Sequence, residues 1–376
     1  MLFSRRAKWR KEDFYDREKE LELLLKALDV GEGLIVVHGV RRVGKTSLVY
    51  VGLTEANIPF VPVDLRRFSE IPSLLTLSTI GYYVGEVLKI YEKYRGKLKN
   101  FIDKILEHIE SLNIMGYVGL RFRGRERGKR LFSSVLEEAD RWARKRKTRV
   151  VILLDEAQKL RNIPAWRDIL AWAIDNLENV SFVVTGSEIG VLRDFLKLGD
   201  PESPLFGRAR VEIFLNKFSR EQSIGFLRKG FTEADMNIKE SEIEDAVSKY
   251  DGVVGWLTLY GYYRVTYGIG HKEAVSKVEA EAEELVAKEL EELIRYSPRR
   301  YIAILWAISL GLKTWSTIKH FAEGIAGTIP DNRFDNLLRN LVKYGFVEKT
   351  ENLEYKITDP LTTKAIEKLK RKYGIP

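Results

Sequence analysis

The chain has 376 residues, of which 45% are hydrophobic and 31% are charged, enough for two or three domains that each bury a core. It contains no cysteine and only four histidines, which excludes disulfides, thiolate nucleophiles and Cys-ligated zinc and argues against a histidine-built metal site. No apolar run of about 18 residues exists, and no apolar segment follows the basic stretch 4–11, so we expect a cytoplasmic protein without membrane contact.

The net charge of +9 is unevenly distributed along the chain. Residues 121–149 hold 12 basic and 4 acidic side chains, whereas residues 271–296 hold eight glutamates against four lysines and arginines. Residues 298–376 are basic again, with 14 basic side chains against 8 acidic ones. The pattern predicts two basic regions that a polyanion such as nucleic acid would contact. The other interpretation is that these charges only form a solvated surface.

Short apolar strands alternate with amphipathic helices from the N-terminus to Leu215, which predicts a parallel sheet covered on both faces. Five strands are expected, at Leu34–His38, Phe60–Asp64, Val150–Asp155, Ser181–Thr185 and Ala209–Leu215. A long insert, residues 69–148, separates the second strand from the third. Within it the pattern predicts three helices and one short strand or hairpin, at Leu74–Ile90, Lys99–Leu112, Lys129–Arg146 and Tyr117–Phe122.

The pattern changes twice in the second half of the chain. From Ser219 to Tyr296 it is helical throughout, and from Ser297 onward it favours three helices followed by a β-hairpin. That order is typical of a winged helix, with 332–344 as its recognition helix and 350–353 as its wing tip. The expected helices and strands are Tyr301–Leu310, Trp315–Ala322, Arg333–Lys343, Gly345–Lys349 and Glu354–Thr358.

A phosphate-binding loop follows the first predicted strand. The pattern G-x-x-x-x-G-K-[ST] is met by Gly39-Val40-Arg41-Arg42-Val43-Gly44-Lys45-Thr46, with Ser47 next in the helix. Glycines let the backbone N–H groups approach a polyphosphate, and the positive end of the following helix dipole faces the same anion. We expect Lys45 to reach the β- and γ-phosphates and Thr46 to bind Mg²⁺.

The third predicted strand ends in two acids, as a Walker B segment does. Mg²⁺ prefers oxygen ligands, so Asp155 is expected to hold the metal beside Thr46. Glu156 is expected to orient and deprotonate the water that attacks the γ-phosphate. The alternative interpretation is that both acids merely cap the next helix.

Two further groups are candidates for catalysis. Thr185 or Ser187, at the end of the fourth strand, would sense the γ-phosphate or fix the attacking water, unless they only cap a helix. Arg208 and Arg210, before the fifth strand, offer an arginine finger, acting in the same chain or in a neighbouring one.

The ordered series of motifs resembles that of the archaeal ATPase family within the STAND class of AAA+-related P-loop proteins. The motifs are Phe14–Leu21 with Tyr15-Asp16-Arg17-Glu18, the phosphate loop, Asp155-Glu156-Ala157-Gln158, Thr185-Gly186-Ser187 and Gly207-Arg208. The resemblance implies an ATPase core over 1–216, a helical lid over 217–296 and a winged helix over 297–376. It also implies that Tyr15 and Arg17 lie against the adenine and that Arg208 is the family's Gly-Arg position. Where the family has Gly-x-Pro in the lid, this chain has Gly252-Val253-Val254.

The winged helix allows two interpretations. In the first, Arg333, Arg339 and Lys343 face DNA phosphates, with Lys349 and Lys356 helping from the wing. In the second it is a regulatory module packed on the lid, which the acids in the same elements favour.

The fold class we expect is therefore α/β: a P-loop NTPase core of AAA+ type with a five-stranded parallel sheet, then a helical lid and a winged helix. The leading hypothesis is a Mg²⁺-dependent switch that binds ATP, hydrolyses it slowly to ADP and couples its nucleotide state to the winged helix. The second hypothesis is a DNA-binding regulator that uses ATP as a ligand with little or no hydrolysis. A kinase is the third, disfavoured because no acceptor site is evident. Self-association, a protein partner and the purpose of the insert stay open.

Overall fold

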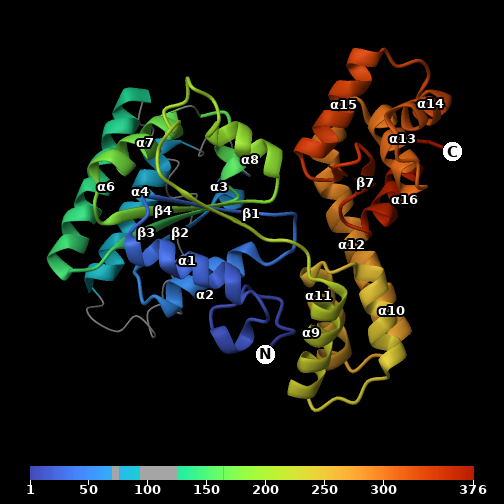
Figure 1. Cartoon of the computed structure of the whole chain (residues 1–376), viewed down its shortest axis with the longest axis horizontal. Helices are drawn as coiled ribbons and strands as arrows, with labels where there is room; N and C mark the ends of the chain where they lie inside the picture. Colours follow the sequence, from blue (N-terminus) through green and yellow to red (C-terminus); the bar gives the residue numbers. More distant parts are fainter. Residues whose placement is uncertain (70–75, 94–124, 164) are drawn as a thin grey trace.

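The structure is a computed structural model that describes residues 1–69, 76–93, 125–163 and 165–376. The helix predicted at 99–112 and the strand or hairpin predicted at 117–122 lie outside the described residues. In the described part, an α/β unit comes first, a helical unit second and a unit of helices with a small hairpin last. Figure 1 shows the second and third units together on one side of the first.

The first unit is built on a five-stranded parallel sheet in the order β2-β3-β4-β1-β5. All five predicted strands are confirmed, three of them with the predicted ends. The strands are β1 Leu34–His38, β2 Phe60–Asp64, β3 Val150–Asp155, β4 Val180–Gly186 and β5 Val211–Phe214.

Helices cover both faces of this sheet because alternate residues of each strand point to opposite faces. Ile35 and Val37 of β1 pack with α1 and α2, whereas Leu34 and Val36 pack with α4, α6, α7 and α8 (Figure 1). The helices of the unit are η1 Lys11–Asp13, α1 Glu18–Val30, α2 Lys45–Glu55, α3 Leu65–Ser69, α4 Leu77–Lys93, α6 Arg125–Arg146, η5 Ala157–Leu160, α7 Ala165–Asn176 and α8 Ile189–Leu196. Two predicted helices of the insert are thus confirmed as α4 and α6, with shifted ends.

The strand order decides where a site can form. In a parallel sheet the carboxyl ends of all strands lie at one edge, and β4 lies between β1 and β3. The loop after β1, the acids that end β3 and the hydroxyls that end β4 therefore meet there, although they are far apart in the sequence. Strand pairing brings them together, in the register His38↔Gly186 between β1 and β4 and Leu154↔Val184 between β3 and β4.

The second unit consists of four helices, α9 Arg220–Glu233, α10 Glu240–Tyr250, α11 Val254–Thr266 and α12 His271–Ile294. This region is helical throughout, as predicted. The first helix begins with a capping box, in which the Ser219 side chain accepts from the Gln222 backbone and the Gln222 side chain accepts from the Ser219 backbone.

The third unit has the predicted order of a winged helix plus one helix more. Its elements are α13 Pro298–Ser309, α14 Trp315–Ala326, α15 Asp331–Lys343, β6 Val347–Lys349, β7 Tyr355–Ile357 and α16 Thr362–Lys372. The sequence analysis missed α16. The spacing of its buried residues Ala365, Ile366 and Leu369 fits one face of a helix and would have indicated it.

Helix α16 explains the uneven charge of the sequence. Its lysines and arginine pair with glutamates of α12, at 2.9 Å for Lys364–Glu279, and also in Lys368–Glu284, Arg371–Glu283 and Lys372–Glu291. The expectation that the basic tail meets a polyanion is therefore wrong for α16, because the acidic stretch of the same chain already neutralises it. None of the helices in the described ranges is long and apolar enough to cross a membrane.

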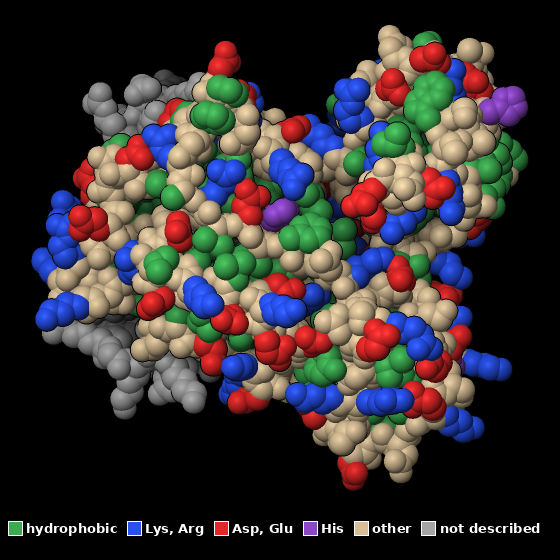
Figure 2. Space-filling view, viewed as in Figure 1, with side chains coloured by type: hydrophobic (Ala, Val, Ile, Leu, Met, Phe, Trp, Pro, Cys, Tyr) green, Lys and Arg blue, Asp and Glu red, His purple; other side chains and the backbone are tan. Residues whose placement is uncertain are grey.

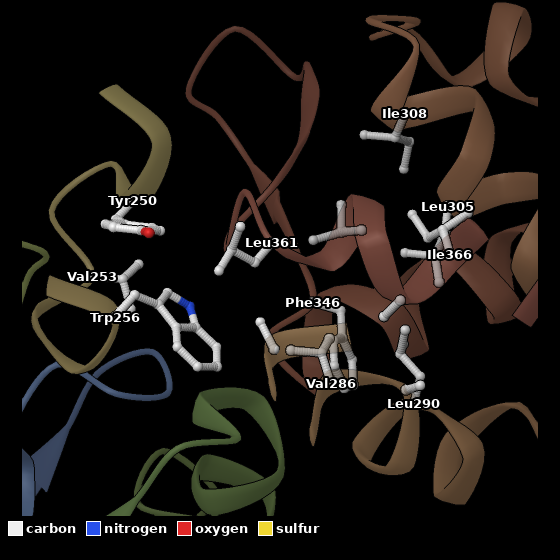
Figure 3. Close-up of a cluster of buried hydrophobic side chains, with 14 of the residues drawn as sticks. Tyr250, Val253, Trp256, Val286, Leu290, Leu305, Ile308, Phe346, Leu361 and Ile366 are labelled. Atoms are coloured by element: carbon white, nitrogen blue, oxygen red, sulfur yellow. The ribbon is translucent and has the colours of Figure 1, made fainter. Parts of the chain in front are cut away.

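The lid and the winged helix share one hydrophobic core. A single cluster of buried side chains runs from α9 through α12 to α16. Figure 3 shows the indole of Trp256 directed from the lid toward the winged-helix side, where Phe346 and Leu361 lie. The indole N–H donates to the Asp359 carboxylate at 2.9 and 3.0 Å. The two units are therefore packed on each other, in agreement with the regulatory interpretation of the winged helix.

The first nine residues form a segment that bridges the lid and the core. Leu2 and Phe3 are buried in the lid, where the Phe3 ring packs on Phe231 at 4.9 Å between centroids. At the other end, the Trp9 ring stacks on Tyr50 of α2 at 3.8 Å. This N-terminal segment, residues 1–9, therefore has one end in each unit.

Candidate functional site

The phosphate loop, Gly39–Ser47, connects β1 to α2 in a shape that depends on its two glycines. A Cβ at Gly39 would come within 2.3 Å of the Leu215 carbonyl oxygen, so no larger residue fits there. Gly44 has a φ of 95°, a left-handed conformation, at the start of α2. Backbone N–H groups and the positive end of α2 consequently face the same space, as an anion site requires.

Lys45 is buried beneath this loop, with 6% of its surface exposed. Its Nζ donates to the carbonyl oxygens of Gly39 at 3.0 Å and Val40 at 2.8 Å. Burial lowers the pKa of Lys45 from 10.5 to about 8, because a buried ammonium group loses its hydration. A polyphosphate would offer this ammonium group full negative charges in place of two carbonyl dipoles.

The lowered pKa predicts that the binding of ATP takes up protons. Phosphate oxygens beside Lys45 favour its charged form and raise its pKa again. Above about pH 8, free protein with neutral Lys45 must therefore gain a proton as ATP binds, and the affinity falls as the pH rises toward about 10. Calorimetric titrations at about pH 8.5 in two buffers of different ionisation enthalpy will give different heats; identical heats would contradict the prediction.

Asp155 lies next to Thr46, as the sequence predicts. The Thr46 hydroxyl is 3.3 and 3.2 Å from the two carboxylate oxygens of Asp155, and the carboxylate also accepts from the hydroxyl of Thr185. Burial raises the pKa of Asp155, and the neighbouring Glu156 adds to the effect. A buried carboxylate beside a hydroxyl at the mouth of a phosphate loop fits Mg²⁺, which takes few protein ligands and fills its shell with phosphate oxygens and waters. No cluster of three or more His, Asp or Glu side chains that could hold a metal alone occurs among the described residues.

Glu156 occupies the wall of the cavity beyond Asp155. Its backbone has a φ of 59°, a left-handed conformation that is costly outside glycine and is common at functional sites. Its Oε2 accepts from the Ser187 hydroxyl at 2.7 Å and from the Gln158 amide. Burial acts to raise the pKa of Glu156, but the charge of Lys45 and these two hydrogen bonds outweigh it, and the net pKa lies below its usual value. Glu156 is therefore ionised at neutral pH.

The sequence does not distinguish the roles of Thr185 and Ser187, but in the structure the two hydroxyls have different contacts. Thr185 is completely buried, donates to Asp155 and accepts from the backbone N–H of Glu156 at 3.2 Å. It does not line the cavity; its hydroxyl contacts the carboxylate of Asp155, the last residue of β3, and the backbone N–H of the next residue, Glu156. Ser187 donates its hydroxyl to the carboxylate of Glu156, whereas Thr185 contacts only the backbone of Glu156.

Arg66 is a site residue that the sequence analysis missed. It lies in α3 directly after β2, lines the cavity, and pairs with Asp64 at 2.9 Å and with Asp155 at 3.3 Å. Strands β2 and β3 pair in the register Asp64↔Asp155, which brings this guanidinium group to the acids. The sequence offered one indication of this group: Asp64 ends β2 as Asp155 ends β3, and Arg66 follows Asp64 by two residues.

A cavity of about 390 Å³ opens in front of the phosphate loop, a size typical of ligand sites. Its walls come from the loop, the N-terminal segment, the start of α11 and residues 13–17. Tyr15 lines it and packs edge-on against Phe218 and Phe226, and Arg17 lines it with its guanidinium group bound to the Asn216 carbonyl at 2.6 Å. The structure thus brings Tyr15 and Arg17 to the same cavity as Lys45.

Arg42 of the phosphate loop reaches away from β1 toward the lid. It pairs with Glu289 of α12 at 2.6 Å, approaches Asp359 at 3.7 Å and lies over the Trp256 ring at 4.4 Å. Its carbonyl accepts from the N–H of Gly255 at 2.9 Å, directly after the lid residues Gly252-Val253-Val254.

Arg41 reaches the winged helix itself. Its guanidinium group donates to the Tyr344 carbonyl at 2.7 Å, lies over the Phe346 ring at 4.5 Å, and pairs with Glu188 at 3.1 Å and Glu289 at 3.3 Å. Two consecutive residues of the phosphate loop therefore contact the core, the lid and the winged helix at once.

Arg208 is not brought to this cavity. It precedes β5 and so lies at the amino edge of the sheet, opposite the phosphate loop, where it pairs with Asp175 at 2.5 Å. Its part in catalysis stays a prediction, since Arg208 does not line the cavity of its own chain.

Comparisons with known proteins agree with this geometry. The sequence matches the family model of an ATPase domain predominantly from Archaea over residues 70–259, and that of the MCM protein C-terminal winged helix-turn-helix domain over residues 297–358. A solved Walker-type ATPase of Pyrococcus abyssi is 32% identical with a TM-score of 0.78, and the alignment covers 98% of this chain and 100% of that one.

More remote structures were also found. The ORC2 protein of Aeropyrum pernix, solved in ADPNP–ADP complexes, is 12% identical with a TM-score of 0.46 over 97% of both chains. The RuvB Holliday junction branch migration motor of Thermotoga maritima is 13% identical with a TM-score of 0.44 over 99% of both chains. No curated protein matches the sequence.

Proposed function

Because this chain belongs to the family of ATPase domains found predominantly in Archaea, we propose that it is an ATP-hydrolysing switch whose nucleotide state sets the position of its winged helix. We assign it to the STAND class of AAA+-related proteins on the order of its motifs. We assign residues 1–216 to the ATPase core, 217–296 to the lid and 297–376 to the winged helix.

The chemistry follows from the residues around the cavity. The N–H groups of the phosphate loop and Lys45 would bind the phosphates of ATP, with Tyr15 and Arg17 toward the base. Thr46 and Asp155 would hold Mg²⁺, which when bound neutralises charge on the phosphates. Ionised Glu156 would accept a proton from the attacking water, while Ser187 holds its carboxylate in place.

The proposed switch rests on one observation. Arg42 lines the cavity in front of the phosphate loop and also pairs with Glu289 of the lid. Phosphates in the cavity would compete with Glu289 for this guanidinium group. A ligand can shift an equilibrium between two arrangements only when it interacts differently with each, and this competition supplies such a difference. Arg41 would transmit a change at Glu289 to the winged helix, because Arg41 also pairs with Glu289 and donates to the Tyr344 carbonyl of the winged helix.

Fluorescence transfer between the core and the winged helix tests the switch. The chain has no cysteine, so dyes can be attached through Glu202→Cys and Glu351→Cys, two exposed positions in the two units. ATP with Mg²⁺ should change the transfer efficiency, and Arg42→Ala should remove most of that change.

Arg228→Ala is the matched control, since Arg228 of α9 pairs with Glu240 at 2.5 Å away from the cavity. The control should respond to ATP as the parent does. An unchanged efficiency on addition of saturating ATP would refute the switch, and a full response in Arg42→Ala would refute the route through Arg42.

The second function is a DNA-binding regulator that uses ATP as a ligand. It is supported by the match of residues 297–358 to a winged helix-turn-helix domain and by the exposed Arg333 and Arg339 on the predicted recognition helix. The wing contributes less than predicted, because Lys356 pairs with Glu348 at 3.1 Å. Phosphate release with ATP alone separates the two functions, since a regulator of this kind would release almost none.

A further inference from the structure

A second cavity lies between the three units, lined by residues of each. It has a volume of about 520 Å³. Its walls are one face of α15, the carboxyl end of α12 with the residues that follow, and Arg161 directly after η5. Arg161 follows Glu156 closely in the sequence, so the cavity borders the segment that carries the proposed base.

The cavity concentrates positive charge that the chain itself does not neutralise. Arg161, Arg295 and Arg333 line it, and none of these guanidinium groups forms a hydrogen bond or an ion pair with any described residue. On much of the face that Figure 2 shows, basic and acidic side chains are interspersed. The one acid in the lining, Glu292, is paired with Lys159 at 3.3 Å. Three unneutralised guanidinium groups around one cavity are suited to an anion with several charges.

Helix α15 presents a polar stripe to this cavity. Arg333, Asn336, Asn340 and Lys343 line it, and their spacing of three, four and three residues places them on one face. Lys343 is paired with Asp194 of α8, and Asn340 donates to the Tyr301 hydroxyl at 2.9 Å. Arg339 is not part of the lining, and its contact with DNA phosphates together with Arg333 and Lys343 stays a prediction.

Two tyrosine rings line the cavity next to its arginines. Tyr296 lines the cavity with 82% of its surface exposed, and the Arg295 guanidinium lies 5.0 Å from its ring centroid. Tyr344 lines it too, 6.0 Å from the Arg161 guanidinium group. An exposed ring next to cationic groups is the arrangement on which unpaired bases stack while phosphates are neutralised.

We propose that this cavity binds a single strand of nucleic acid, with phosphates on Arg161, Arg295 and Arg333 and a base on Tyr296. The volume is that of a small-ligand pocket, in the range of about 300–1,000 Å³, and it is too small for a double helix. Asn336 and Asn340 supply amides for base edges. The proposal extends the second function above, since it names the nucleic acid and moves its site from the outer face of the winged helix to the space facing the core.

Fluorescence anisotropy with labelled single-stranded oligonucleotides, one DNA and one RNA, tests the proposal on the full chain. In low salt, the double variant Arg161→Ala/Arg333→Ala should bind at least tenfold more weakly than the unmodified chain. The slope of log affinity against log salt should fall by about 1.4, because each phosphate contact to a single strand contributes about 0.7. Tyr296→Ala should weaken binding without changing that slope.

Arg371→Ala is the matched control, being an exposed arginine of the same unit that pairs with Glu283 outside the cavity. It should bind as the unmodified chain does, and a duplex of the same sequence should compete poorly. Overturning results are absence of single-strand binding at low salt, equal competition by the duplex, or a loss in Arg371→Ala as large as in the double variant. The rise in Tm on adding ATP, measured on the same samples, reports the nucleotide site separately and should persist in every variant.

Discussion

Glu156→Gln will bind ATP as tightly as the unmodified chain and will hydrolyse it about 10²–10⁴ times more slowly. The amide keeps the size of the side chain and its contact with Ser187, but it cannot accept a proton from water. Calorimetry gives the affinity, and phosphate release from a single turnover gives the rate.

The control for this variant is Glu212→Gln, which makes the same change on β5 of the same sheet, outside the cavity. It should hydrolyse ATP at the parental rate. If Glu156→Gln hydrolysed ATP as fast as this control, another group would have to be the base. The contact between Ser187 and Glu156 would then have no catalytic role.

Lys45→Met will lose nucleotide binding while keeping its fold. The ammonium group offers charge-assisted hydrogen bonds of about 1.5–3 kcal/mol each, so the affinity for ATP should fall by about 100-fold or more. The free protein should melt at the same temperature as the parent or higher, because methionine fills the space without the cost of a buried charge, a cost that the lowered pKa of Lys45 records.

Thermal unfolding with and without ATP measures both effects at once. Lys26→Met, an exposed lysine of α1 paired with Glu22, serves as the control and should show the full rise in Tm with ATP. A similar rise in Lys45→Met would contradict the assignment of the phosphate site. A large drop in the Tm of the free variant would contradict the account of Lys45 as a costly buried charge.

Local sequence predicted those parts of the fold and site that depend on short-range pattern. The strands of the core are short apolar runs, and Gly39, Gly44 and Lys45 are fixed by their spacing alone. Asp155 and Glu156 were recognised because they end such a run, and the structure places both beside the phosphate loop.

The parts that were missed depend on which elements become neighbours. Arg66 reaches Asp155 only because β2 pairs with β3. Arg41 and Arg42 looked like variable positions within the loop motif, and their partner Glu289 belongs to α12, a lid helix remote from them in the sequence. The end of a strand predicts that Thr185 or Ser187 senses the γ-phosphate or fixes the attacking water, but it does not reveal that Thr185 is completely buried and bound to Asp155.

The N-terminal segment limits how far the lid can swing. Phe3 is embedded among lid helices and Trp9 is stacked on the ATPase core, and the six residue steps between them can stretch to only about 21 Å. The segment is a tether between the lid and the core. The lid can move away from the core only until residues 3–9 are fully extended, unless Phe3 or Trp9 leaves its packing site. Residues 4–8 of this segment also line the cavity, so the part that would cover a bound nucleotide is also the part that limits how far the lid can move from the core.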